Sequence, residues 1–125
     1  MPLYLRIAVP SPLRRLFDYL PPLDWDPEAA EALTPGVRVR VPFGRRSVVG
    51  ILVATATHTE VPWAQLKTAD AVLDRTPILT PAVVDLCRWA ATYYLHPAGE
   101  VFSAALSKRL REGRAPHRDA WRISP

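Results

Sequence analysis

The sequence has little cysteine and no long apolar run, which excludes several classes of protein. Its 125 residues include one cysteine, Cys87, so neither an internal disulfide framework nor a cysteine-rich zinc site can form. No apolar run approaches the roughly 20 residues that a membrane helix requires. The first residues, MPLYLRIAVP, show no basic region followed by a long apolar stretch. We therefore expect a cytoplasmic protein that folds as one domain.

The motifs of common enzyme classes are also missing. There is no GxxxxGK[ST] phosphate loop, no GxGxxG and no HExxH in the sequence. The three histidines, His58, His96 and His117, lack the spacing of metal ligands. Cys87 could pair with a histidine for nucleophilic catalysis, but it lies within an apolar segment, where a cysteine is usually part of the core. We predict no enzymatic activity, no metal and no cofactor for this chain.

Positive and negative charges balance over most of the chain, and the net positive charge is concentrated at its C-terminal end. The formal net charge is +4, from 16 basic and 12 acidic residues. Residues 107–125 hold six of the basic and two of the acidic residues, so the remaining residues are balanced. The pairs Asp24/Asp26 and Asp70/Asp74 are expected to be solvated surface charges. A localised basic segment makes nucleic acid a candidate partner, because bound cations release counterions from phosphates.

Alternating apolar and polar residues predict a sheet in the first part of the chain. Extended segments are expected at residues 3–9, 16–20, 37–43, 47–57 and 66–74. Within 37–43 the valines should face the core, whereas Arg38 and Arg40 should face solvent. Gly50 predicts a bulge or a sharp bend, as in a small closed barrel. Asp26 and Pro27 could begin one helical turn in the acidic loop between two of these segments.

Two helices are expected after the strands. Thr80 supplies an N-cap hydroxyl and Pro81 suits the first helical position. Residues 81–95 are apolar on most faces, so this helix should be largely buried. Residues 100–112 form the second helix, and Gly113 suits the position after its end. The predicted fold is α+β: a small antiparallel barrel-like sheet of about five strands, followed by two C-terminal α-helices that cover it.

Three segments combine residue types that could bind a ligand. In FDY (residues 17–19) two aromatic rings flank a carboxylate, which suits either a pocket with a flat wall or an ordinary edge strand. Gly44, Arg45 and Arg46 suit either a turn that binds phosphate or a hairpin turn with solvated arginines. Lys67 lies on a predicted strand and is ordinarily a solvated side chain.

The order of these segments resembles a known family. The chain contains, in order, PLRRLFDYLPP, GVRVRVPFGRRSVVGILV, QLKTADAVLD and WAATYYLHPAGEV, followed by a helix that ends in KRLREGR. From residue 3 to residue 114 this series resembles the N-terminal DNA-binding domain of the PriA family, the bacterial primosomal replication-restart helicases (primosomal protein N′). The resemblance implies that residues 1–113 form a 3′-end DNA-binding domain. It also implies that residues 114–125 are a linker toward a helicase region absent from this chain.

The resemblance implies a function that composition does not. Domains of this family capture the 3′ end of the nascent leading strand at a stalled or branched fork, without regard to the base, and thereby orient the helicase. Carried onto this chain, the 3′-end pocket would contain Phe17, Asp18, Tyr19, Phe43, Gly44 and Lys67. Arg45 and Arg46 could contact the neighbouring phosphates. The resemblance implies a monomer in the cytoplasm, associated with the nucleoid. Its partners would be DNA and other primosome and restart proteins, and it would have no ATPase or helicase activity of its own.

One departure and one alternative accompany this resemblance. The family often has a leucine-proline step where this chain reads Leu106-Ser107-Lys108, which predicts that the second helix runs on. The alternative function is a small-barrel protein-interaction module of the primosome without terminus-specific DNA binding. Its motivation is the broad apolar face of residues 81–95, which could dock a partner. Preference for a 3′-hydroxyl end separates the two, because a protein adaptor would show none.

Overall fold

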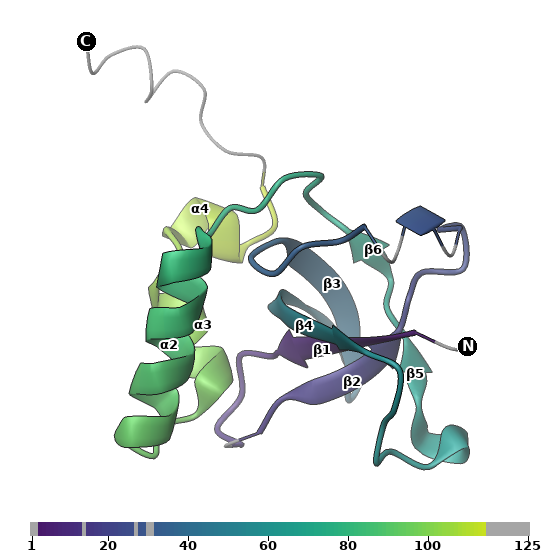
Figure 1. The fold of residues 1–125 in the computed structure, drawn as a ribbon, viewed down its shortest axis with the longest axis horizontal. Helices are drawn as coiled ribbons and strands as arrows, with labels where there is room; N and C mark the ends of the chain where they lie inside the picture. Colours follow the sequence, from purple (N-terminus) through teal and green to yellow (C-terminus); the bar gives the residue numbers. More distant parts are fainter. Residues whose placement is uncertain (1–2, 14, 27, 30–31, 115–125) are drawn as a thin grey trace, which may run out of the picture.

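A curled sheet lies beside a layer of helices in the computed structural model, which describes residues 3–13, 15–26, 28–29 and 32–114 (Figure 1). The strands are β1 (Tyr4–Ala8), β2 (Phe17–Leu20), β3 (Arg38–Phe43), β4 (Arg46–Ala56), β5 (Lys67–Thr68) and β6 (Ala71–Val72). The helices are α2 (Pro81–Tyr93), α3 (Ala98–Ala104) and α4 (Lys108–Arg111), with a 3₁₀ turn, η1, at Trp63–Gln65. The predicted α+β class is confirmed. Apart from Arg114, the predicted linker lies outside the described residues.

The strand order is β5-β2-β1-β4-β3-β6, and every pairing is antiparallel except that of β2 with β5. The predicted strand 66–74 is divided into β5 and β6, because the chain turns between them. The Ala69 amide donates to Leu20 on β2 and the Asp70 amide donates to Arg40 on β3. This short segment therefore bridges the two edges of the sheet and closes the curl into a barrel-like shape.

Two apolar clusters hold the layers together. The inner face of the barrel contains Leu5, Ile7, Val9, Tyr19, Val37, Val39, Val41, Leu52 and Ala69. The second cluster lies between the sheet and the helices and contains Ala8, Ile51, Val53, Leu79, Val84, Cys87, Phe102 and Leu106. Cys87 is thus part of the core, as predicted. Full burial of a side chain such as Phe102 contributes about 1.5–3 kcal/mol, so the helices are an integral part of the domain.

Two glycines are required by close backbone approach. A Cβ on Gly50 would lie 2.5 Å from Cγ2 of Ile7, so the glycine lets β4 cross β1 closely. The bulge itself lies elsewhere, because the β1–β4 register shifts between Arg6 and Ile7. A Cβ on Gly99 would lie 1.5 Å from the carbonyl oxygen of Val9, so the start of α3 rests on the backbone that follows β1. Any side chain at Gly99 would separate the helices from the sheet.

The prediction that Arg38 faces solvent is wrong, and so is the prediction that Asp74 is solvated. The two side chains are 1% and 6% exposed and form an ion pair of 2.7 Å. The guanidinium donates through Nε and Nη2 to the carboxylate of Asp74, and through Nη1 to the carbonyl oxygens of Leu110 and Arg114. The reason is that α4 and the turn after it cover the outer face of β3, which alternation alone cannot reveal. Arg40 is half-buried.

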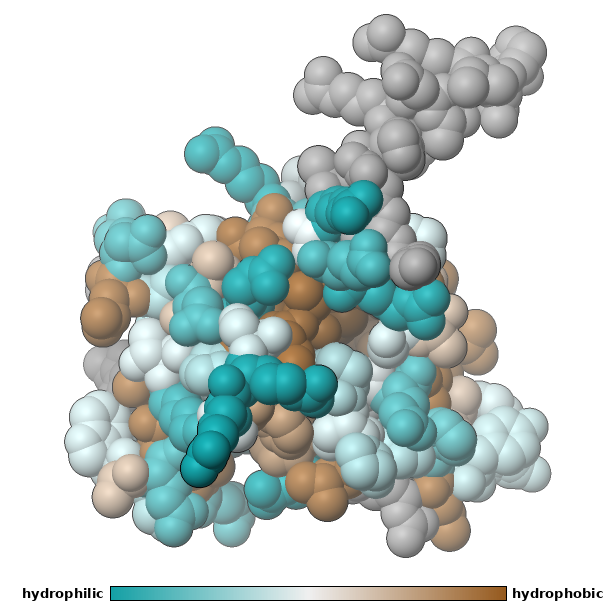
Figure 2. Space-filling model, turned by 180° about the vertical axis from the view of Figure 1, so that it is seen from behind, coloured by the Kyte–Doolittle hydropathy of each residue, from teal (hydrophilic) through white to brown (hydrophobic). Residues whose placement is uncertain are grey.

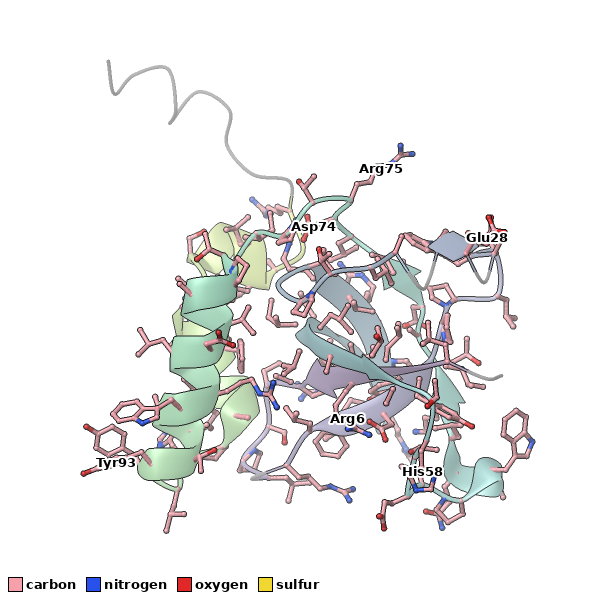
Figure 3. The ribbon with its side chains drawn as sticks, viewed as in Figure 1. Arg6, Glu28, His58, Asp74, Arg75 and Tyr93 are labelled. Carbon is pink, nitrogen blue, oxygen red and sulfur yellow. The ribbon has the colours of Figure 1, made fainter. Side chains whose placement is uncertain are left out.

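Helix α2 begins as predicted but is less buried than predicted. The side chain of Thr80 accepts a hydrogen bond from the amide of Val83, with Pro81 in the first turn. Its buried residues are Val84, Cys87 and Ala91, whereas Leu86, Trp89, Tyr93, Tyr94 and Leu95, at the far side and end, are exposed. The sheet offers α2 one face to cover, so the opposite side of the helix stays in solvent. Tyr93 accordingly points away from the sheet (Figure 3).

The predicted second helix is interrupted. Helix α3 ends at Ala104, and α4 starts at Lys108. Between them, Leu106 turns into the core, and the hydroxyl of Ser107 accepts a hydrogen bond from the amide of Leu110, which begins a new helix. The expectation that the helix runs on through Ser107 is therefore wrong. Gly113 follows α4 with φ of 86°, as predicted for a residue after a helix end. No helix of the described residues is long and apolar enough to cross a membrane.

Candidate nucleic-acid interface

A pocket of about 430 Å³ lies where β2, the β3–β4 turn and β5 meet. It is lined by Arg6, Arg15, Leu16, Phe17, Asp18, Tyr19, Pro42, Phe43, Gly44, Glu60, Val61, Gln65 and Lys67. The six residues predicted for the 3′-end pocket are all among them. The structure therefore brings together side chains from three separate segments. Arg45 and Arg46, predicted as phosphate contacts, are exposed beside the pocket but do not line it.

Strand pairing explains why these segments meet. Tyr19 on β2 lies opposite Lys67 on β5 in the parallel pair. The hydroxyl of Tyr19 donates a hydrogen bond of 2.9 Å to the carbonyl oxygen of Pro42, which ties β2 to the end of β3. Gly44 then turns the chain with φ of 63°, a conformation that favours glycine. The pocket is thus built on strands and one tight turn.

The carboxylate of Asp18 is the most firmly held polar group in the pocket. Arg6 lies opposite Asp18 in the β1–β2 pair and donates through Nε to Oδ1 at 2.9 Å and through Nη2 to Oδ2 at 3.3 Å. The hydroxyl of Thr59 donates to Oδ2 at 2.6 Å. Burial alone would raise the pKa of Asp18, but these hydrogen bonds and the charge of Arg6 outweigh it and lower that pKa. Asp18 is therefore an ionised, fixed acceptor at neutral pH.

This carboxylate retains capacity for a ligand. An ionised carboxylate only accepts hydrogen bonds and offers about four lone-pair sites. Among the described residues three donors contact Asp18, two of them on Oδ2 and one on Oδ1. The carboxylate, which lines the pocket, thus has lone pairs beyond those that these donors use. Such a site accepts a hydroxyl group and repels an anion at the same position.

Aromatic rings form one wall of the pocket. Phe17 and Phe43 are half-buried, with ring centroids 5.2 Å apart and planes at 84°. The guanidinium of Arg15 lies 4.6 Å from the centroid of Phe17, a cation–π contact. Tyr19 is 4% exposed, and its pKa is raised to about 12 by burial and by the charge of Asp70. Tyr19 is therefore a buried, neutral support, and the two phenylalanines offer the apolar surface to a ligand.

Sequence reasoning missed several lining residues. Arg6 could have been found, because β1 and β2 are neighbouring strands and an arginine directly opposite an aspartate is a favourable cross-strand pair. Glu60, Val61 and Gln65 line the pocket from the connection between β4 and β5, which carries no periodic pattern, and Thr59 of the same connection donates to Asp18. Lys67 is exposed at the rim, where its ammonium group can reach a phosphate. Within the described residues no cluster of three or more His, Cys, Asp or Glu side chains could hold a metal ion.

Comparisons with known proteins identify the family of the chain. A model of the family described as 3′DNA-binding domain (3′BD) of PriA matches residues 6–107. Replication restart protein PriA of Haemophilus influenzae is 39% identical over 122 residues, which are 95% of this chain and 16% of that protein. The protein of the same name from Buchnera aphidicola of Acyrthosiphon pisum is 30% identical over 107 residues, 84% of this chain and 14% of its own length. The chain thus spans a small fraction of these relatives, and it belongs to the PriA 3′ DNA-binding domain family.

Proposed function

We propose that this domain captures the terminal nucleotide at the 3′ end of a DNA strand, with little regard to the base. One observation carries the proposal: the fixed carboxylate of Asp18, whose Oδ1 accepts one hydrogen bond from the described residues, lines a pocket that also contains aromatic rings. A free 3′-hydroxyl is a donor and matches that acceptor, whereas a 3′-phosphate is repelled. The name of the family, 3′ DNA-binding domain, supports the same assignment.

The other residues of the site contact different parts of the nucleotide. Phe17 and Phe43 contact the sugar or base through their apolar surfaces, which do not discriminate between bases because every base has a π-face. Gly44 presents an open backbone at the turn, where no neighbouring atom lies within 4 Å of its added Cβ position. Lys67 and the exposed Arg45 hold the adjacent phosphates. Base edges are not read, so affinity depends on the terminus.

The relatives suggest the setting in which such capture operates. They are replication restart proteins several times longer than this chain. We propose that the domain, residues 1–113, recognises the 3′ end of a nascent leading strand at a stalled or branched fork and orients a helicase region on the DNA. In this setting it acts as a monomeric binding module beside other primosome proteins.

A titration of two labelled forks tests the assignment. The forks are identical except that the leading strand ends in a 3′-hydroxyl or a 3′-phosphate. We expect the hydroxyl fork to bind more tightly, and Asp18→Ala to lose about tenfold or more in affinity for it, because a hydrogen bond to a charged group contributes about 1.5–3 kcal/mol. Asp24→Ala, which removes an exposed carboxylate outside the pocket, is the control. Equal binding of both forks by the wild-type protein would refute terminus capture.

The exposed side of α2 favours a second candidate, a protein-interaction module. The rings of Trp89 and Tyr93 stack at 4.9 Å in solvent, with Leu86 and Tyr94 also exposed. Exposed apolar groups of this kind mark docking surfaces. A Trp89→Ala variant should keep its preference for the hydroxyl fork if DNA capture is the function of the pocket. Weak binding without end preference, in both proteins, would favour the interaction module.

A further inference from the structure

A second hollow, separate from the 3′-end pocket, carries an excess of positive charge. It has a volume of about 470 Å³ and is lined by Pro10, Arg40, Arg46, Ser47, Val48, Val49, Arg111 and Glu112. Three of these side chains are guanidinium groups and one is a carboxylate, so the lining has an excess of cations. Viewed from behind, the molecule shows strongly hydrophilic side chains around a patch of apolar ones (Figure 2).

The three arginines have no acidic partner among the residues that the structure describes. No ion pair within 4.0 Å involves Arg40, Arg46 or Arg111. The carboxylate of Glu112 lies 3.7 Å from Arg114 instead. This differs from Arg38, two residues before Arg40 on the same strand, whose donors are all directed at Asp74 and backbone carbonyls. Free guanidinium groups in one hollow suit an external anion with several acceptor oxygens.

Packing restricts the side chain of Arg40, and the position of α4 determines where Arg111 lies. Arg40 is half-buried, and its Nη2 lies 2.3 Å from the Cβ position of Gly113, so a side chain at that glycine would displace the guanidinium. Val49 lies beside the same Cβ position, at 3.3 Å. Arg111 comes from α4, which Arg38 holds against β3 through the carbonyl of Leu110. The hydrogen bond from Arg38 to the carbonyl oxygen of Leu110 therefore also positions the helix that brings Arg111 to the hollow.

The β3–β4 hairpin connects this hollow to the 3′-end pocket. Phe43 lines the pocket and lies directly opposite Arg46, which lines the hollow. Arg40 precedes Phe43 by three residues on β3, so the two residues are about 10 Å apart along the strand and their side chains leave opposite faces of the sheet. That length corresponds to about three nucleotides along the axis of duplex DNA. A strand whose 3′ end occupies the pocket can bring its preceding phosphates past Arg46, at the end of the hairpin, to the hollow.

We propose that the hollow formed by Arg40, Arg46 and Arg111 binds the phosphodiester backbone of the DNA arm whose 3′ end occupies the pocket. The proposal rests on the proposed function and extends it from the terminal nucleotide to the arm behind it. Each guanidinium group can donate two hydrogen bonds to phosphate oxygens, while Val49, which lies opposite Arg40 in the β3–β4 pair, offers an apolar surface to the sugars. The contact adds affinity for any sequence and makes the binding salt-dependent.

The test compares two double variants on two DNA ligands. Arg40→Gln with Arg111→Gln removes two charges from the hollow, and Arg75→Gln with Arg88→Gln removes two exposed charges that line neither it nor the 3′-end pocket. One ligand is a trinucleotide with a free 3′-hydroxyl, and the other is the hydroxyl fork with its full duplex arm. Each ligand is titrated at several salt concentrations. Urea unfolding confirms that both variants are folded.

The quantity compared is the slope of the logarithm of the binding constant against the logarithm of the salt concentration. In the hollow variant, Arg40→Gln with Arg111→Gln, we expect this slope for the fork to be smaller in magnitude by about 1.8, because each duplex phosphate contact contributes about 0.9. The trinucleotide should bind the hollow variant and the wild-type protein equally. A slope for the hollow variant equal to that of the control variant would overturn the proposal. So would an equal loss of affinity for the trinucleotide, or binding of polyglutamate through these arginines with the DNA slope unchanged. If the slope falls but the wild-type protein ignores the 3′-hydroxyl, terminus capture fails and the backbone site stands.

Discussion

The molecule contains two arginine–aspartate pairs in one sheet, and they differ in what surrounds them. Arg38 and Asp74 are 1% and 6% exposed, and the guanidinium is further bonded to two backbone carbonyls. Arg6 and Asp18 are 37% and 10% exposed, and the carboxylate faces a pocket. Asp74 lies near the top of the structure in Figure 3, and Arg6 lies in its lower half.

The difference shows how the same two residue types can be enclosed in the protein in one place and stay accessible from a pocket in another. The buried pair satisfies its charges entirely within the protein, so removing one partner leaves an uncompensated charge. The open pair contributes little to stability, because water competes for Arg6. Arg6 instead keeps Asp18 ionised and oriented. A solvent-facing partner is thus consistent with a carboxylate that serves a ligand.

The largest expected effect is on stability, at the buried pair. Asp74→Ala should lower the free energy of unfolding by about 3–5 kcal/mol, because Arg38 is then buried without its partner. Urea unfolding monitored by tryptophan fluorescence measures the change. The matched variant at the open pair, Asp18→Ala, should cost no more than about 1 kcal/mol. Similar losses in the two variants would show that the pairs do not differ as described.

A smaller effect is expected on binding, at the open pair. Arg6→Met retains much of the side-chain volume and removes the group that orients Asp18. Affinity for a 3′-hydroxyl strand should fall by about two- to fivefold, since an exposed ion pair contributes about 0.2–1 kcal/mol. The fluorescence anisotropy of a labelled strand measures this change. An affinity for the phosphate-ended strand that fell by the same factor would assign Arg6 to general phosphate binding instead.

The smallest expected effect is on the pH dependence of stability, through Asp18 of the Arg6–Asp18 pair. The pKa of Asp18 is lower in the folded protein than in the unfolded chain, where it is about 3.9. Its contribution to stability is therefore fully present above that value and lost as the pH falls through the folded pKa. The difference in unfolding free energy between the wild-type protein and Asp18→Asn should shrink on acidification from pH about 5 to pH about 2.5. A difference that stayed constant over that range would contradict the assigned shift.

Much of the fold and of the pocket could be predicted from the sequence. Alternation located β1 and β3, a long apolar run located β4, flanking prolines helped to locate β2, and the cap at Thr80 located the start of α2. The resemblance supplied the six pocket residues, which the structure then brought together. The burial of Arg38 could not be predicted, since it depends on a helix that follows some seventy positions later in the chain. The exposure of Trp89 and Tyr93 depends equally on how much sheet is available to cover α2.

Arg38 also determines where the chain leaves the barrel. Its guanidinium holds the carbonyl of Leu110 at 3.0 Å and that of Arg114 at 2.7 Å, while Asp74 holds the guanidinium itself. The backbone at Arg114 is thus anchored to a strand of the barrel. The point at which the chain leaves the barrel is therefore fixed relative to the pocket at Phe17, Asp18 and Lys67, which is the geometry that the proposed orienting role requires.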